Sequence, residues 1–120
     1  MSNRPWLDNR VIRPGDIIIE QVPDWCGHTG VRKRRPVIVL DTVDNNSSGP
    51  KRLVPLSCST WDEDSIQIEA DDDNMLSRNC SAVPAGTFSL DASDVIIRPP
   101  HGNVGEEMLD VVKEAVDVQA

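Results

Sequence analysis

The side chains best suited to chemistry on a phosphate are concentrated in one short stretch. Arg32 to Arg35 are four consecutive cations, and they form the basic cluster of an otherwise acidic chain. His28 lies just before them, between Gly27 and Gly30, where the backbone can turn freely. A guanidinium is always charged and its planar fork matches phosphate oxygens, so a rigidly held Arg35 would suit an anion. The ordinary pKa of histidine lets His28 act as an acid or a base near neutrality.

The run from Val37 to Leu40 is expected to position this cluster. Its apolar and largely β-branched composition favours a central strand buried on both faces over a helix. Pro36 has no N–H for a ladder, so we place it at the first position of that strand. The strand would hold Arg35 at a fixed point beside the glycine-rich loop. A plainer alternative stays open, because an arginine before a strand is often a solvated cation and a loop histidine is often merely exposed.

The segments on either side predict a chain that is mostly β. Ile17–Val22 and Lys51–Ser57 are rich in strand-forming residues, and Ser65–Ala70 alternates as a half-solvated strand does. Pro55, inside the second of these, suggests an edge strand or a bulge. Shorter apolar segments that could extend the sheet are 79–83, 87–91 and 94–98.

The C-terminal segment predicts one helix. Asn103 is followed three residues later by Glu106, which resembles a capping box. We therefore expect a mainly β fold class with α (α+β): antiparallel strands in a strongly curved sheet or small barrel, covered by a C-terminal helix. One domain would span 1–120, with 1–11 as a loose N-terminal arm. The apolar residues at helical spacing are Met108, Leu109, Val112, Ala115 and Val116.

Composition limits the function classes. The chain has 20 acidic and 12 basic residues, and its formal net charge of -8 argues against tight non-specific binding of nucleic acid. Because the bases cluster, one basic groove stays compatible with this balance. The separate cysteines Cys26, Cys58 and Cys80 predict reduced thiols rather than a disulfide framework or a zinc site. With neither a membrane-spanning run nor a leader, we expect a soluble cytoplasmic protein with no membrane partner.

Common catalytic signatures are missing from the sequence. It contains no P-loop, no GxGxxG, no GxSxG and no HExxH. Two histidines exclude a multi-histidine metal centre, and Asp71-Asp72-Asp73 lacks the spaced ligands of a calcium loop. We therefore expect no metal and no cofactor, so any catalysis would use arginine, histidine, serine or a carboxylate.

Three motifs in a fixed order resemble those of the MazF/PemK (Kid) toxins of bacterial toxin–antitoxin systems. The first is Pro14-Gly15-Asp16-Ile17-Ile18. After a glycine-rich loop comes Arg35-Pro36-Val37-Ile38-Val39-Leu40, and then Leu53-Val54-Pro55-Leu56-Ser57. Ile66-Gln67-Ile68-Glu69, Leu90-Asp91 and the C-terminal helix follow in the family's order. The resemblance covers roughly Arg13 to Val118.

The resemblance implies a fold, an activity and partners. The fold would be an SH3-like barrel, and the assembly a homodimer. The activity would be that of a toxin, a metal-independent, sequence-specific endoribonuclease (an mRNA interferase) that cleaves single-stranded RNA. Its products would carry a 2′,3′-cyclic phosphate and a 5′-hydroxyl. A cognate antitoxin would cover the groove with a partly disordered segment.

The resemblance also implies roles for single residues. Arg35 matches the arginine of the family's Arg-Pro motif and would stabilise the charge that develops on the phosphate. Ser57 matches the hydroxyl residue at the end of the third strand and would hydrogen-bond the phosphate. His28 lies where the PemK branch places a catalytic histidine and would transfer protons. The cations expected to contact the RNA are Arg32, Lys33, Arg34, Lys51 and Arg52.

Two alternatives remain. One is a catalytically silent or gyrase-directed protein-binding module on the same fold. The acidic composition and the departures from the family favour it, because Phe88 replaces a family arginine. In addition, Val83-Pro84-Ala85-Gly86 contains neither the arginine nor the aspartate that the PemK branch has there. The other alternative is an unrelated small β-barrel interaction domain.

Overall fold

The structure, a computed structural model, describes residues 11–22, 33–44, 46–57, 65–95 and 100–119. Its strands are β1 (Val11–Ile12), β2 (Asp16–Val22), β3 (Lys33–Val39), β4 (Val43–Asp44), β5 (Pro50–Ser57), β6 (Ile66–Ile68), β7 (Cys80–Ala82), β8 (Phe88–Asp91) and β9 (Gly102–Asn103). The helix is α1 (Glu106–Gln119), and two short 3-10 turns are η2 (Pro84–Gly86) and η3 (Ala92–Asp94).

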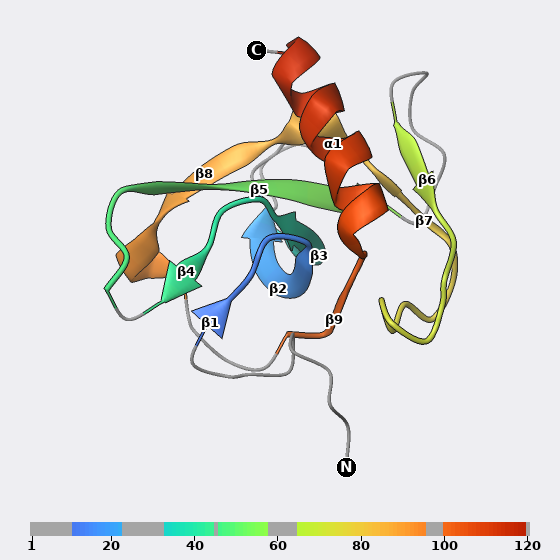
Figure 1. The fold of residues 1–120 in the computed structure, drawn as a ribbon, viewed down its shortest axis with the longest axis horizontal. Helices are drawn as coiled ribbons and strands as arrows, with labels where there is room; N and C mark the ends of the chain where they lie inside the picture. Colours follow the sequence, from blue (N-terminus) through green and yellow to red (C-terminus); the bar gives the residue numbers. More distant parts are fainter. Residues whose placement is uncertain (1–10, 23–32, 45, 58–64, 96–99, 120) are drawn as a thin grey trace.

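Strand β5 is the centre of the main sheet. The strand order is β6-β7-β5-β3-β2-β9, and β8 pairs with the first half of β5. All these pairings are antiparallel, and β1 and β4 form a separate two-stranded ribbon. The main sheet curls into a half-barrel with α1 lying across it (Figure 1). The prediction of a mainly antiparallel β fold with one C-terminal helix is therefore confirmed.

The sheet separates two clusters of buried side chains, because alternate residues of a strand point to opposite faces. The helix-side cluster includes Ile38 of β3 and is covered by Val112 and Val116 of α1. The opposite-side cluster includes Val37 and Val39 of the same strand. The apolar run is thus buried on both faces, as its composition predicts, and the helical stripe covers one of them.

The prediction that Pro36 begins this strand is wrong. Strand β3 starts at Lys33, so Pro36 lies inside it, opposite Ile19 of β2. Leu40 N donates to Arg52 O on β5 (3.0 Å), and every second residue of β3 faces that same neighbour. The nitrogen of Pro36 therefore faces the β5 side, where pairing has already ended at Val37. Its missing N–H removes no ladder hydrogen bond there, which is why the proline is tolerated inside the strand.

Pro55 is not on an edge strand. Strand β5 pairs with β8 from Pro50 to Leu53, and with β7 from Leu56 to Ser57. Pro55 lies between these two stretches, and its carbonyl accepts a hydrogen bond from Val83 N (3.0 Å). The proline thus marks the point where β5 exchanges one partner for another.

The helix begins differently from the predicted capping box. Leu109 N donates to Gly105 O (2.9 Å), the first i to i−4 bond of α1, so Gly105 occupies the cap position. Gly105 has φ +88, a left-handed conformation that favours glycine. Asn103 instead accepts from Gly105 N (2.7 Å) and donates to Asp16 Oδ1 (2.8 Å). Asn103 therefore ties β9 to the start of β2.

Within the described ranges, no helix is long and apolar enough to cross a membrane.

Candidate functional site

Arg35 lies on β3, on the face of the sheet opposite α1. It stands across from Glu20 of β2 in the antiparallel register, and both residues are half-buried. Alternation along β3 gives Arg35 the same face as Val37 and Val39, which belong to the opposite-side cluster. The apolar run from Val37 to Leu40 predicts that Arg35 lies just before a strand. The structure places it within one, where pairing with Glu20 of β2 restricts its backbone.

Ser57 is the last residue of β5 and is buried, with 6% of its surface exposed. It shares the face of Leu53 by alternation, whereas Leu56 points into the helix-side cluster. Ser57 lies opposite Ser81 of β7, and Ser81 lies opposite Gln67 of β6. A row of three polar residues therefore crosses these strands on the face opposite α1.

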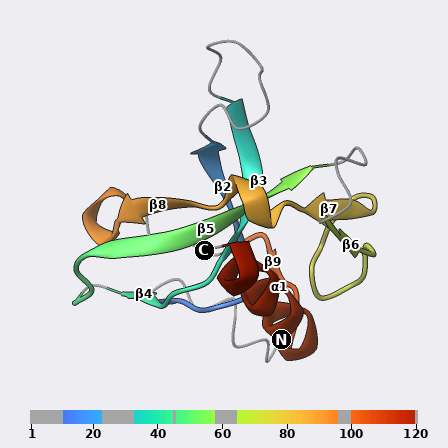
Figure 2. The same cartoon turned by 90° about the horizontal axis from the view of Figure 1, so that it is seen from above.

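Arg35 and Ser57 flank the point at which β3 and β5 part. The last pair of the β3–β5 ladder is Val37 with Pro55, and each candidate lies two residues beyond it on its own strand. Past that pair β3 continues alongside β2, while β5 turns to β7 (Figure 2). The fold therefore brings these two predicted site residues to one face, at one end of the shared ladder. The polar row formed by Ser57, Ser81 and Gln67 extends from this point.

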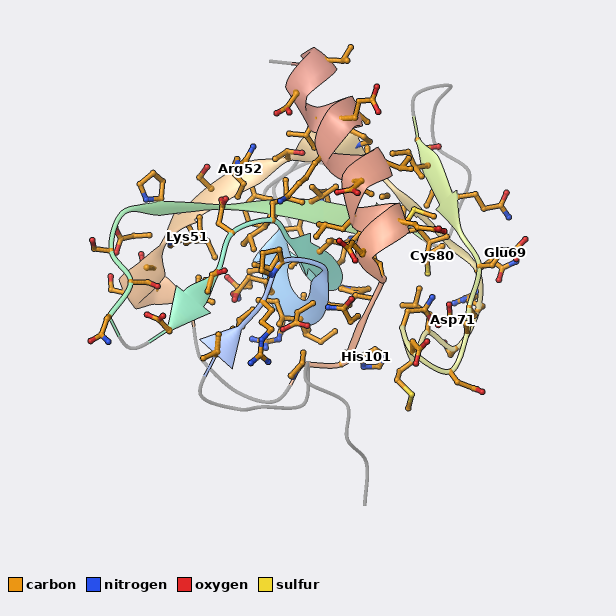
Figure 3. The ribbon with its side chains drawn as sticks, in the orientation of Figure 1. Lys51, Arg52, Glu69, Asp71, Cys80 and His101 are labelled. Carbon is orange, nitrogen blue, oxygen red and sulfur yellow. The ribbon has the colours of Figure 1, made fainter. Side chains whose placement is uncertain are left out.

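Lys51 and Arg52 lie at the other end of β5. Ser57 is six positions along the strand from Lys51, which corresponds to roughly 20 Å along an extended strand. Arg52 donates to Asp41 through Nε (3.3 Å) and Nη2 (3.2 Å), and its Nη1 lies 3.8 Å from Asp117 of α1. Both basic residues are labelled in Figure 3, on the opposite side of the molecule from Glu69. The structure thus does not bring them to the Arg35 end of the sheet.

The Arg52–Asp41 contact was not identified from the sequence. Burial alone would raise the pKa of Asp41, but hydrogen bonds from Arg52 and the charges of Arg52 and Lys51 outweigh it, so the pKa lies below its usual value. No sequence motif predicts this pair, since Asp41 and Arg52 are 11 residues apart, on either side of the connection that contains β4.

The remaining basic candidates are divided between described and undescribed parts of the chain. His28 and Arg32 lie outside the described residues, as does the side chain of Lys33. Arg34 is exposed and stands opposite Gln21 of β2. Because side chains alternate, Arg34 points to the other face from Arg35. The predicted roles of all these residues stay predictions.

The two departures from the family pattern are structural in this protein. Phe88 of β8 lies opposite Leu53 and packs against the opposite-side cluster. The segment that follows β7 forms η2, in which Pro84 and Gly86 are buried. These positions therefore complete the hydrophobic core and a turn, and they add no charge to the face that holds Arg35.

Asp16, in the first of the three motifs, is a buried carboxylate. It accepts from Arg13 N (2.8 Å) and from Asn103 Nδ2 (2.8 Å). Burial raises the pKa of Asp16 above its ordinary value. The two hydrogen bonds and, in addition, the nearby charge of Arg13 offset that rise only in part. It lies in the turn that opens β2, so its role is to hold the start of the sheet.

Together these features define a small antiparallel half-barrel with a C-terminal helix and a partly polar face. No protein-family model matches this chain, and no curated protein sequence matches it significantly.

Proposed function

We propose that this protein is a metal-independent endoribonuclease that cleaves single-stranded RNA, as the toxin of a toxin–antitoxin pair. The observation that supports it is the shared position of Arg35 and Ser57, on one face of the sheet where β3 and β5 part. This is the pair that the family resemblance assigns to the phosphate, and the two come from strands that are separate in the sequence. A permanent cation and a hydroxyl on one face of a sheet suit a phosphodiester.

The reaction needs no atom from outside the RNA. The 2′-oxygen attacks the adjacent phosphorus, and the bond from phosphorus to the 5′-oxygen breaks. The 2′-hydroxyl proton leaves and the 5′-oxygen gains a proton, giving a cyclic phosphate and a 5′-hydroxyl. Arg35 would stabilise the extra charge on the pentavalent phosphorus, and Ser57 would hold a phosphate oxygen. His28, outside the described residues, is the proposed proton carrier.

The polar row beside Ser57 supports an extended substrate. Adjacent strands are about 4.8 Å apart, so Ser57, Ser81 and Gln67 span roughly 10 Å across β5, β7 and β6. Hydroxyl and amide groups can hydrogen-bond a sugar, a phosphate or a base edge. An RNA strand bound at Arg35 would therefore meet polar groups on its way to β6. A homodimer, a cognate antitoxin that covers this face and a cytoplasmic location belong to the same proposal.

A cleavage assay with matched arginine variants tests this proposal. Purified protein is incubated with a long single-stranded RNA in excess chelator, and the ends of the products are identified. Arg35→Ala should abolish the discrete fragments at any RNA concentration. Arg34→Ala, one residue away on the other face, loses only a predicted RNA contact and should retain most cleavage at saturating RNA. Equal cleavage by wild type and Arg35→Ala would show that the assignment is wrong.

The second candidate is a protein-binding module on the same fold. It is favoured by the net charge of -8, by the ion pairs that engage Arg52, and by the apolar Phe88. RNA affinity measured against salt separates the two. Contacts made by clustered cations should weaken steeply as salt rises, whereas a protein-directed module should show no RNA binding at any salt concentration.

A further inference from the structure

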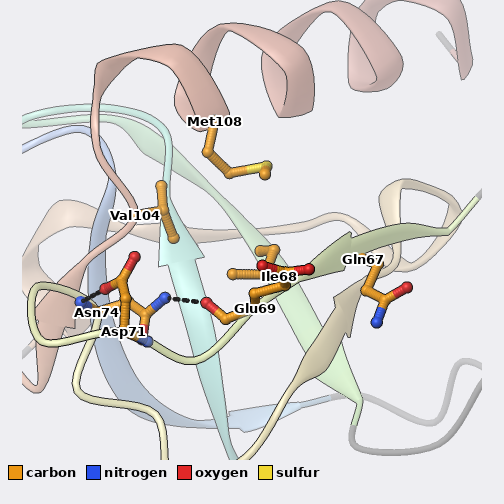
Figure 4. Close-up of a pocket in the computed structure, with 7 residues that line it drawn as sticks. All are labelled: Gln67, Ile68, Glu69, Asp71, Asn74, Val104 and Met108. Carbon is orange, nitrogen blue, oxygen red and sulfur yellow. Dashed lines mark hydrogen bonds between the residues drawn. The ribbon is translucent and has the colours of Figure 1, made fainter.

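A groove lies on the helix side of the sheet, away from the face that holds Arg35. Its first part is a hollow of about 300 Å³ between β6, the turn after it and the start of α1. Its second part, of about 450 Å³, runs along the first turns of α1. Val104 and Met108 line both parts, so the two hollows adjoin. Figure 4 shows the residues that line the first hollow.

The floor of this groove is apolar. Ile68 is buried in the helix-side cluster, and Val104 and Met108 pack against it from above. Val111 lies one helical turn beyond Met108, lines the second hollow and keeps 48% of its surface exposed. α1 thus presents an apolar edge in addition to the stripe of Val112 and Val116 that covers the sheet.

The rim of the groove is acidic. Glu69 and Asp71 line the first hollow, and Glu106 and Glu107 line the second, all four of them exposed. Among the described residues, neither hollow is lined by a lysine or an arginine. Asp71 is held in place because its Oδ1 accepts from Asp73 N (2.9 Å) and Asn74 N (2.7 Å).

We propose that this groove docks a basic amphipathic helix of a partner protein. Charge complementarity selects the occupant: the helix would lay an apolar face on Val104, Met108 and Val111, with lysine or arginine side chains reaching the acidic rim. Nucleic acid is repelled by four carboxylates, and an acidic segment would be as well. Gln67, at the far end of the polar row, also lines the first hollow. Neither Arg35 nor Ser57 lines either hollow, so the proposal does not depend on the ribonuclease assignment.

A peptide of leucine and lysine is the probe for this surface. Its leucines are spaced at i, i+3, i+4 and i+7, it carries a fluorophore, and its binding to the whole protein is followed by fluorescence anisotropy. A second peptide has every lysine replaced by glutamate. We expect the basic peptide alone to bind, more weakly at high salt because the rim charges are screened.

Two groove variants and two matched controls locate the binding site. Val111→Lys places a cation on the floor, and Ile19→Lys makes the same change at an exposed isoleucine of β2. The double change Glu69→Gln and Glu107→Gln removes two rim charges. Its control, Asp94→Asn, removes one charge from η3, where Ala92 N donates to Gly49 O just before β5. Each groove variant should lose about tenfold in affinity, and each control less than about twofold. Thermal unfolding of every variant confirms that the fold is retained.

Several results would overturn the proposal. One is that wild type fails to bind the basic peptide or binds the acidic one equally. Another is that Ile19→Lys and Asp94→Asn lose as much affinity as the groove variants. That result would show that the peptide binds through the general acidity of the chain and not at the groove. Sedimentation that finds a dimer dissociated by Val111→Lys would assign the groove to a second copy instead.

Discussion

Asp16 and Asn103 are 87 residues apart in the sequence, and Asn103 Nδ2 donates to Asp16 Oδ1 at 2.8 Å. The contact joins the turn that opens β2 to the strand that precedes α1. Val104 N also donates to Gly15 O (3.0 Å), so the start of β2 and the segment before α1 are fastened at one place.

Asn103→Ala should destabilise the fold. The variant loses the bond to a buried carboxylate and the bond from Gly105 N, which together are worth about 2 kcal/mol. Urea unfolding followed by circular dichroism measures the change. Asn46→Ala, an exposed asparagine in the 41–50 connection, is the control and should change stability by less than about 0.5 kcal/mol. Equal effects of both variants would contradict the proposed role of the contact.

The raised pKa of Asp16 predicts a pH dependence with a definite sign. Because the folded protein holds this proton more tightly than the unfolded chain, the stability it contributes is fully present below pH 3.8. That contribution is lost as pH rises through the higher folded value. Asp16→Asn removes the titration, so wild-type stability minus variant stability should fall over this range and then level off. A difference that rises with pH would show that the pKa is lowered instead.

Gly102→Ala should destabilise the fold, because Gly102 is buried against the turn after β6. A Cβ at Gly102 would overlap the backbone carbonyl of Asn74, which cannot move without breaking the turn held by the Asn74 side chain. Overpacking of this kind costs about 1 to 3 kcal/mol. Gly49→Ala is the comparison: Gly49 has φ +83 but open space around it, so only backbone strain of about 1 kcal/mol applies. If thermal unfolding ranks Gly49→Ala as the worse variant, the close contact is not decisive.

The Asp41–Arg52 pair should stabilise the protein above acid pH. Burial opposes the ionised form of Asp41, but its contacts with Arg52 dominate and lower its pKa. Its stabilisation is therefore present above pH 3.8 and is lost as pH falls through the lower folded value. Because both side chains are partly exposed, Asp41→Asn should cost only about 1 kcal/mol at neutral pH, and less at high salt. An effect unchanged between neutral and strongly acidic pH would exclude this electrostatic origin.

Ser57→Ala tests the second member of the proposed catalytic pair. Ser57 is buried at the end of a strand, so the change removes a hydroxyl with little change in volume. Loss of one hydrogen bond to the reacting phosphate should slow RNA cleavage about a hundredfold. Ser81→Ala, on the paired position of β7, should slow it less than about tenfold. Equal losses would indicate that the hydroxyls bind RNA and do not act on the reacting phosphate.

Sequence patterns predicted the elements better than their ends. Ile17–Val22 and Lys51–Ser57 became β2 and β5 almost residue for residue, because β-branched and apolar runs favour strands wherever they pack. The stripe that contains Val112 and Val116 became the buried face of α1. The start of β3 was wrongly predicted at Pro36. A proline is tolerated inside a strand when the neighbour that its nitrogen faces no longer pairs there, and the sequence does not show which neighbour that is.

Local features of this protein follow from the sequence alone: which segments are strands, where the helix lies, and that the apolar run after Arg35 is buried on both faces. Tertiary structure alone decided which distant residues meet. The β3–β5 register set Arg35 and Ser57 at one end of a shared ladder and Lys51 at the other. It also brought Arg52 to Asp41 and Asn103 to Asp16. Propensity and periodicity act within a few residues along the chain, whereas these contacts follow from strand pairing and chain closure, which neighbouring residues do not encode.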